Sequence, residues 1–165
     1  MQQPSEINRA HPAAERQSPP ARHYSQRAYE LTRHFEGLRL RAYQDQSGIW
    51  TIGYGHTGPD VHAGLTITEA EANALLVRGI AIAAACVCRV VTVDLSQGQF
   101  DALVDFVFNL GCERLRGSTL LAHVNAAEFD LAAAQFLRWD HAGGVAVPGL
   151  LVRRQAEMAL FQSKS

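Results

Sequence analysis

Two acidic residues stand close together in the sequence, and the first could act as a proton donor. Glu36 falls in the last turn of a predicted helix, beside the partial negative charge of the helix C-terminus. Its neighbours Phe35 and Leu38 are apolar. Both effects disfavour the carboxylate, so we expect Glu36 to hold a proton near neutral pH. Position alone favours a solvated glutamate at a frayed helix end.

Asp45 and Thr51 add a second carboxyl group and a hydroxyl group. Asp45 belongs to a predicted turn over 44–48, and Thr51 points away from the apolar face of a predicted strand that contains Trp50. A hairpin folded back on the helix would bring both side chains toward Glu36. In glycoside hydrolysis, one carboxyl group protonates the leaving oxygen while the other activates water or acts as nucleophile. The simpler alternatives are a turn-forming aspartate and a threonine chosen for its strand propensity.

The sequence around these residues resembles the phage-type lysozymes, or endolysins, of glycoside hydrolase family 24. The family pattern is Glu, eight residues, Asp or Cys, five residues, and Thr, and Glu36, Asp45 and Thr51 match all three positions. The flanking stretches HFEGLRLRAY and TIGYGHT match as well, and the resemblance covers about Tyr24 to Phe161.

This resemblance implies a muramidase that hydrolyses the β-1,4 bond between N-acetylmuramic acid and N-acetylglucosamine in peptidoglycan and so lyses the host bacterium. Glu36 would be the general acid, and Asp45 and Thr51 would position or activate the attacking water. It implies no cofactor and no metal. The expected substrate partner is the peptidoglycan glycan strand.

Three further residues receive supporting roles from the same resemblance. Arg153 would lie near Glu36 and hold it by a charge-assisted hydrogen bond, which opposes the effect of the helix dipole. Phe108 would line the sugar cleft or pack in the core, and His56 would have a structural hydrogen-bonding role. Relatives often have an acidic residue near Gly79 that could fix the His56 region, and this chain does not.

Other readings of the same residues remain open. A lytic transglycosylase would leave a 1,6-anhydro sugar, and the presence of both Asp45 and Thr51 speaks against it. A zinc amidase could use His56, His62 and Cys112, but no spacing such as HExxH supports it. A non-catalytic wall-binding protein is the third alternative.

The expected fold is α+β and lysozyme-like: a small antiparallel β-sheet lobe and a larger all-helical lobe, with the active-site cleft between them. Ser25 caps a first helix that ends at Glu36, before Gly37, and residues 38–55 form the sheet. Capping boxes predict the starts of two more helices. The later helices are expected at about 68–89, 96–110, 118–124, 128–139 and 148–161.

Composition bounds the organisation and the partners. The 165 residues are 47% hydrophobic with a net charge of −1, which is ordinary for a globular protein and argues against nucleic-acid binding by bulk electrostatics. Residues 1–23 are polar and rich in proline, so we expect a flexible extension before a catalytic domain at 24–165. A monomer is expected.

The expected location is the host cytoplasm, and later the periplasm. The first residues lack the apolar core of a secretory signal, and the longest apolar run, 80–88, is far shorter than the roughly 20 residues of a membrane span. A separate holin would therefore have to permeabilise the membrane. The three cysteines, Cys86, Cys88 and Cys112, are expected to be plain buried thiols in a reducing compartment.

Overall fold

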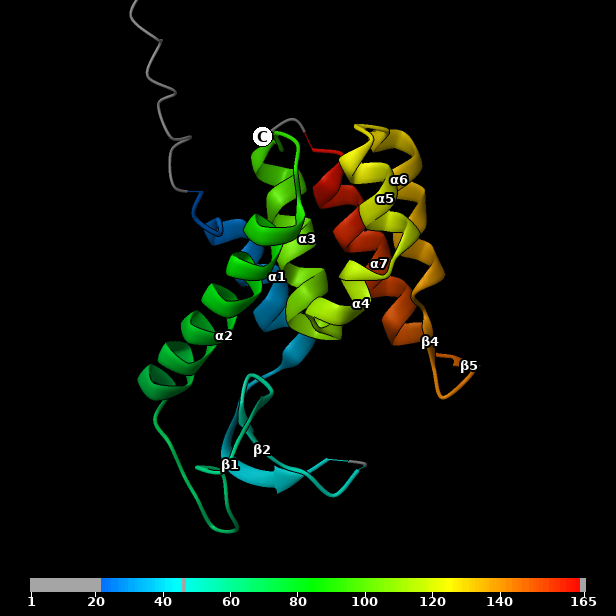
Figure 1. Cartoon of the computed structure of the whole chain (residues 1–165). Helices are drawn as coiled ribbons and strands as arrows, with labels where there is room; N and C mark the ends of the chain where they lie inside the picture. Colours follow the sequence, from blue (N-terminus) through cyan, green and yellow to red (C-terminus); the bar gives the residue numbers. More distant parts are fainter. Residues whose placement is uncertain (1–21, 46, 164–165) are drawn as a thin grey trace, which may run out of the picture.

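The computed structural model describes residues 22–45 and 47–163, and it has a small sheet at one end and a bundle of helices at the other (Figure 1). The predicted α+β arrangement of two lobes is confirmed. Most of the predicted N-terminal extension, residues 1–21, lies outside the described residues.

Helix α1, Gln26–Glu36, begins and ends where its sequence signals predict. The Ser25 side chain accepts a hydrogen bond from the Ala28 backbone N–H, which satisfies one of the free donors of the first turn. Gly37 follows with a positive φ of 67°, a conformation that glycine adopts without strain. Glu36 is thereby the last residue of the helix, at the boundary of the two lobes.

The sheet consists of three antiparallel strands in the order β1 (Arg39–Gln44), β2 (Trp50–Gly53) and β3 (His56–Thr57). The register of β1 and β2 shifts between Arg39 and Tyr43, which marks an irregularity in β1. The hairpin turn between the strands contains Asp45, as the sequence predicts.

Helix α2, Glu69–Val90, runs along the sheet lobe and into the helical lobe (Figure 1). The capping box that the sequence predicts is present, with the Thr68 and Glu71 side chains bonding each other's backbone N–H groups. By length and composition alone α2 could cross a membrane. In this fold one face packs on α3 and on the sheet, while Val77 and Ile82 on the helix are exposed.

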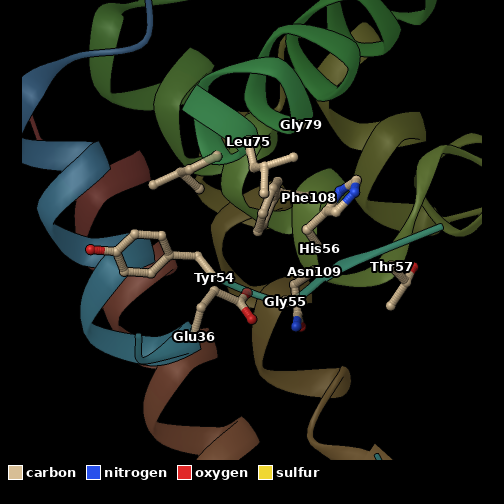
Figure 2. A pocket seen from close by; sticks show the side chains of 10 residues that line it. Glu36, Tyr54, Gly55, His56, Thr57, Leu75, Gly79, Phe108 and Asn109 are labelled. Atoms are coloured by element: carbon tan, nitrogen blue, oxygen red, sulfur yellow. The ribbon is translucent and has the colours of Figure 1, made fainter. Parts of the chain in front are cut away.

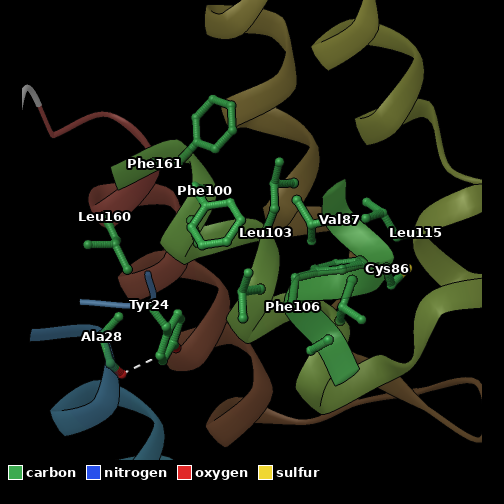
Figure 3. Packing of buried hydrophobic residues seen from close by; sticks show 14 of the residues in the cluster. Tyr24, Ala28, Cys86, Val87, Phe100, Leu103, Phe106, Leu115, Leu160 and Phe161 are labelled. Carbon is green, nitrogen blue, oxygen red and sulfur yellow. Dashed lines mark hydrogen bonds between the residues drawn. The ribbon is translucent and has the colours of Figure 1, made fainter. Parts of the chain in front are cut away.

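Helix α3, Gln97–Leu110, is the centre of the helical lobe, and most of its residues are buried. In the core, Phe100, Leu103 and Phe106 of α3 pack with Phe161 of the last helix and with Val87 of α2 (Figure 3). The remaining elements are α4 (Cys112–Arg116), α5 (Thr119–Asn125), α6 (Phe129–Gln135), the 3-10 helix η1 (Phe136–Arg138), the hairpin β4 (His141–Ala142) and β5 (Val145–Ala146), and α7 (Pro148–Phe161).

The cysteine prediction is wrong. Cys86 of α2 and Cys112 of α4 form a disulfide, with their Cα atoms 6.0 Å apart. Only Cys88 is a free cysteine within the described residues, and it is exposed rather than buried. Packing of α2 against the end of α3 brings the two bonded residues together, although they are 26 positions apart in the sequence.

Candidate active site

A pocket of about 300 Å³ lies where the two lobes meet (Figure 2). We call it the main pocket. Its walls come from the end of α1, the β2–β3 turn, the middle of α2 and the end of α3, so the predicted cleft between the lobes is present. The lining residues are Glu36, Tyr54, Gly55, His56, Thr57, Leu75, Leu76, Gly79, Phe108 and Asn109.

Glu36 faces the main pocket from the end of α1, with its side chain 18% exposed. Arg153 of α7 donates a hydrogen bond from Nη1 to Glu36 Oε1 over 2.6 Å, and this guanidinium is almost completely buried. The structure thus brings together the pair that the resemblance implies. In Figure 2 the Glu36 carboxyl group points toward Gly55 and Asn109 across the pocket.

Gly55 allows the β2–β3 turn to approach the Glu36 carboxyl group closely. A Cβ atom at this position would lie 3.3 Å from Glu36 Oε2, and the backbone φ is +85°. Any other residue would be strained there and would crowd the carboxyl group. Gly55 lies in the stretch TIGYGHT that supports the resemblance, but its residue type alone predicts no role in the site.

Asp45 and Thr51 lie in the sheet lobe and do not line the main pocket. Asp45 Oδ1 accepts hydrogen bonds from the backbone N–H groups of Ser47 and Ile49, both over 2.8 Å, so it stabilises the hairpin turn. Thr51 is buried, and its hydroxyl donates to the Ile49 carbonyl oxygen over 3.1 Å. Among the described residues, no hydrogen bond joins either side chain to Glu36.

His56 and Phe108 both line the main pocket, and Phe108 also packs against the core cluster. The His56 Nε2 atom lies 3.0 Å from Asp60 Oδ2, four residues further along the chain. The hydrogen bond from His56 lowers the pKa of the exposed Asp60 carboxyl group.

Gly79 gives Phe108 its place in the pocket. A Cβ atom at Gly79 would lie 2.8 Å from Phe108 Cε2, a distance that real contacts do not show. The aromatic ring therefore lies directly against the backbone of α2. The absence of an acidic side chain at Gly79 leaves the space that this ring occupies.

Asn109 is a second pocket residue that sequence reasoning missed. Its Oδ1 atom accepts a hydrogen bond from Nη2 of Arg154 over 2.8 Å, and Arg154 is fully buried. Because the amide oxygen of Asn109 accepts this hydrogen bond from the buried Arg154, its NH₂ group can donate a hydrogen bond to another acceptor. No sequence signal indicated this contact, because it depends on how α3 and α7 pack.

A wider groove of about 700 Å³ runs along β1 and also includes Glu36. It is lined by the segment from Leu38 to Tyr43. Glu36 thus stands where two hollows adjoin, one facing the helical lobe and one following the sheet. Such an elongated concave surface suits an extended substrate better than a small molecule.

Comparison with known proteins identifies the family. The family model described as phage lysozyme matches residues 33–157. The chain belongs to the phage lysozyme family. It is 41% identical to the endolysin of Acyrthosiphon pisum secondary endosymbiont phage 1 over 86% of this chain and 99% of that protein. The enzyme is therefore a glycoside hydrolase of the lysozyme type, an endolysin whose substrate is peptidoglycan.

Solved structures agree with this assignment. The fold is similar to the muramidase domain of SpmX from Asticaccaulis excentricus, with a TM-score of 0.80 and 36% identity over 86% of this chain and 98% of that one. It is also similar to a mutant of P22 lysozyme, with a TM-score of 0.76 and 39% identity over 84% of this chain and 97% of that one.

The residues considered for a zinc site have other partners. Cys112 is in the disulfide, His56 pairs with Asp60, and His62 Nδ1 lies 3.1 Å from the Ala63 carbonyl oxygen. In the described part of the chain, no group of three His, Cys, Asp or Glu residues could hold a metal ion. The residues thus give the zinc amidase interpretation no support.

Proposed function

We propose that Glu36 is the general acid that protonates the leaving oxygen of the glycosidic bond. The observation that supports this role is its position at the junction of the two hollows, held over 2.6 Å by the buried Arg153. A fixed carboxyl group at the floor of a cleft is placed to reach a bound glycan strand. The hydrolysed bond is the β-1,4 bond between N-acetylmuramic acid and N-acetylglucosamine.

Replacing Glu36 by glutamine tests this role. Glu36→Gln keeps the shape and removes the transferable proton, so lysis of purified peptidoglycan should fall by about 10²–10⁴-fold. Glu30→Gln is the matched control, because Glu30 is exposed on the same helix and its carboxyl group accepts a hydrogen bond from Gln26. Circular dichroism should show both variants folded. Near-wild-type activity of Glu36→Gln would refute the assignment.

We further propose that Asp45 and Thr51 orient or activate the attacking water, and that the bond is hydrolysed with inversion. Their one-to-one match to the family pattern supports these roles. An inverting pair of carboxyl groups is separated by roughly 6.5–9.5 Å, which leaves room for the water. Arg153, Phe108 and His56 would act as supporting residues around the substrate.

The substitution Asp45→Asn distinguishes the proposed role of Asp45 in activating water from its role in stabilising the hairpin turn. The amide oxygen of asparagine can still accept the two backbone hydrogen bonds at Ser47 and Ile49, so the hairpin should persist. Activity should nevertheless fall, because the negative charge is lost. Full activity with an unchanged melting temperature would show that Asp45 serves only the turn. Thr51→Val tests the hydroxyl group in the same way.

We also propose that the enzyme acts as a monomer and reaches the cell wall with the help of a separate holin. Its production in a bacterial cytoplasm should leave cells intact until chloroform permeabilises the inner membrane. Turbidity should then fall rapidly, and cells that produce Glu36→Gln should not lyse. Lysis without permeabilisation would contradict the need for a holin.

A further inference from the structure

Arg153 is shared between the cleft and a buried pair of carboxyl groups. On the cleft side its Nη1 atom donates to Glu36. On the inner side its Nε atom donates to Asp105 Oδ2 over 3.1 Å and lies 3.4 Å from Glu157 Oε1. Asp105 and Glu157 are fully buried, whereas Glu36 is partly exposed to the main pocket.

Groups from three elements surround this Asp105–Glu157 pair. From α1 and the residues before it, Thr32 Oγ1 donates to Asp105 Oδ1 over 2.6 Å, and the Tyr24 hydroxyl donates to the same atom over 3.4 Å. From α7, Arg154 Nη2 donates to Glu157 Oε1 over 2.7 Å. The charged or titratable groups facing the pair are Arg153, Arg154 and Tyr24, and Arg153 connects the pair to Glu36.

The two carboxyl groups differ in how readily they ionise. Burial raises the pKa of Glu157 well above its usual value, and the charge of Asp105 adds to this effect. Burial also opposes ionisation of Asp105, but the charge of Arg153 and hydrogen bonds from Glu157, Thr32 and Arg153 lower its pKa below the usual value. Burial and the negative charge of Asp105 keep Tyr24 neutral by raising its pKa.

We propose that the buried Asp105–Glu157 pair keeps Glu36 able to hold a proton, because these carboxyl groups contact the inner side of the Arg153 guanidinium and offset its charge. The inference rests on the proposed role of Glu36 as the general acid. A bare arginine in contact with Glu36 would favour the ionised carboxylate, which cannot donate a proton. Asp105 and Glu157 are thus positioning residues: they do not touch substrate and act through Arg153.

The double variant Asp105→Asn/Glu157→Gln removes the buried charge and nearly preserves the side-chain shapes. With both carboxyl groups gone, Arg153 and Arg154 have Glu36 as their remaining counter-charge. The basic limb of the pH profile for peptidoglycan hydrolysis should move to lower pH by about 1–2 units. Activity above that limb should fall about tenfold or more and return on acidification.

Two single variants sharpen the test. Asp105→Asn alone should give a smaller shift, because Glu157 can then ionise and take over the charge. Asp101→Asn is the matched control: it is a buried carboxyl group on the same helix that accepts from the Ser25 backbone and from Gln97 and makes no contact with Arg153. It should lower the melting temperature and leave the basic limb in place.

A basic limb that stays at its wild-type pH in the double variant would overturn the inference. The role of Glu36 would still stand, because Glu36→Gln tests it separately. Carboxyl-carbon NMR of the wild-type protein provides a second measurement that needs no variant to fold. At pH 6 it should show at least one ionised carboxyl group in the Asp105–Glu157 pair, and two protonated carboxyl groups would overturn the inference.

Discussion

Reducing the Cys86–Cys112 disulfide should destabilise the enzyme substantially. The bond closes a segment of 26 residues between α2 and α4. In the chain-entropy description, a loop of this length restricts the unfolded chain by about 3.5 kcal/mol at 25 °C. For a chain of this size, a loss of that magnitude lowers the melting temperature by roughly 7–14 °C.

Most of this loss should come from the unfolded state. Cys86 is buried in the core cluster, and a reduced thiol there remains a small apolar group. The native contacts of α2 should therefore change little on reduction. The bond also borders a hollow lined by Gly79 and Phe108, so the disulfide fixes α2 and α4 close to the wall of the main pocket.

Thermal unfolding followed by circular dichroism, with and without a reducing agent, measures the effect directly. Cys112→Ser should reproduce the reduced curve in the absence of reductant. Cys88→Ser is the control, because Cys88 is exposed and outside the bond, and its curve should overlay that of the oxidised wild type. Thiol titration of the unfolded, unreduced protein should find one reactive group. Three reactive thiols, or coincident curves with and without reductant, would refute this reasoning.

Two further substitutions have expected outcomes. Gly79→Ala should favour the helix by up to about 1 kcal/mol but displace the Phe108 ring, so kcat/KM on peptidoglycan should fall several-fold at a nearly unchanged melting temperature. Thr68→Ala removes the cap of α2 and should cost about 1 kcal/mol in urea unfolding at pH 7. Hydrogen bonds from the Thr68 backbone and side chain lower the pKa of the exposed Glu71, and Thr68→Ala removes only the side-chain bond. The part of the cost that comes from this bond is present above the usual glutamate range and is lost as the pH falls through the lowered value. Wild-type kcat/KM for Gly79→Ala would contradict the first expectation. An equal loss of stability in Thr68→Ala at pH 7 and at pH 2 would contradict the second.

The parts of the fold that could be predicted are those encoded by local signals. Ser25, Thr68 and Ser96 cap their helices as expected, since each side chain reaches a backbone N–H only three residues away. The five-residue helix α4 was missed because it is too short to show a periodic pattern. The hairpin β4–β5 had a readable signal in Gly143–Gly144, whose positive φ angles fit a two-residue turn.

Contacts across the fold could not be read from the sequence. The approach of Cys86 to Cys112 depends on how α2 packs on α3 and α4, and spacing along the chain does not encode it. The approach of Arg153 to Glu36 was expected only from the resemblance to the family. The bond from Arg153 to Asp105 was not expected at all, because nothing local distinguishes Asp105 from a solvated aspartate.

Mass spectrometry of the fragments released from peptidoglycan in ¹⁸O-labelled water tests the proposed mechanism most directly. Hydrolysis by a water bound in the cleft should give fragments with a reducing N-acetylmuramic acid that contains one ¹⁸O atom. NMR of the first product should show inversion at the anomeric carbon. Unlabelled fragments lighter by one water, the mark of 1,6-anhydro sugars, would contradict hydrolysis and favour a lytic transglycosylase.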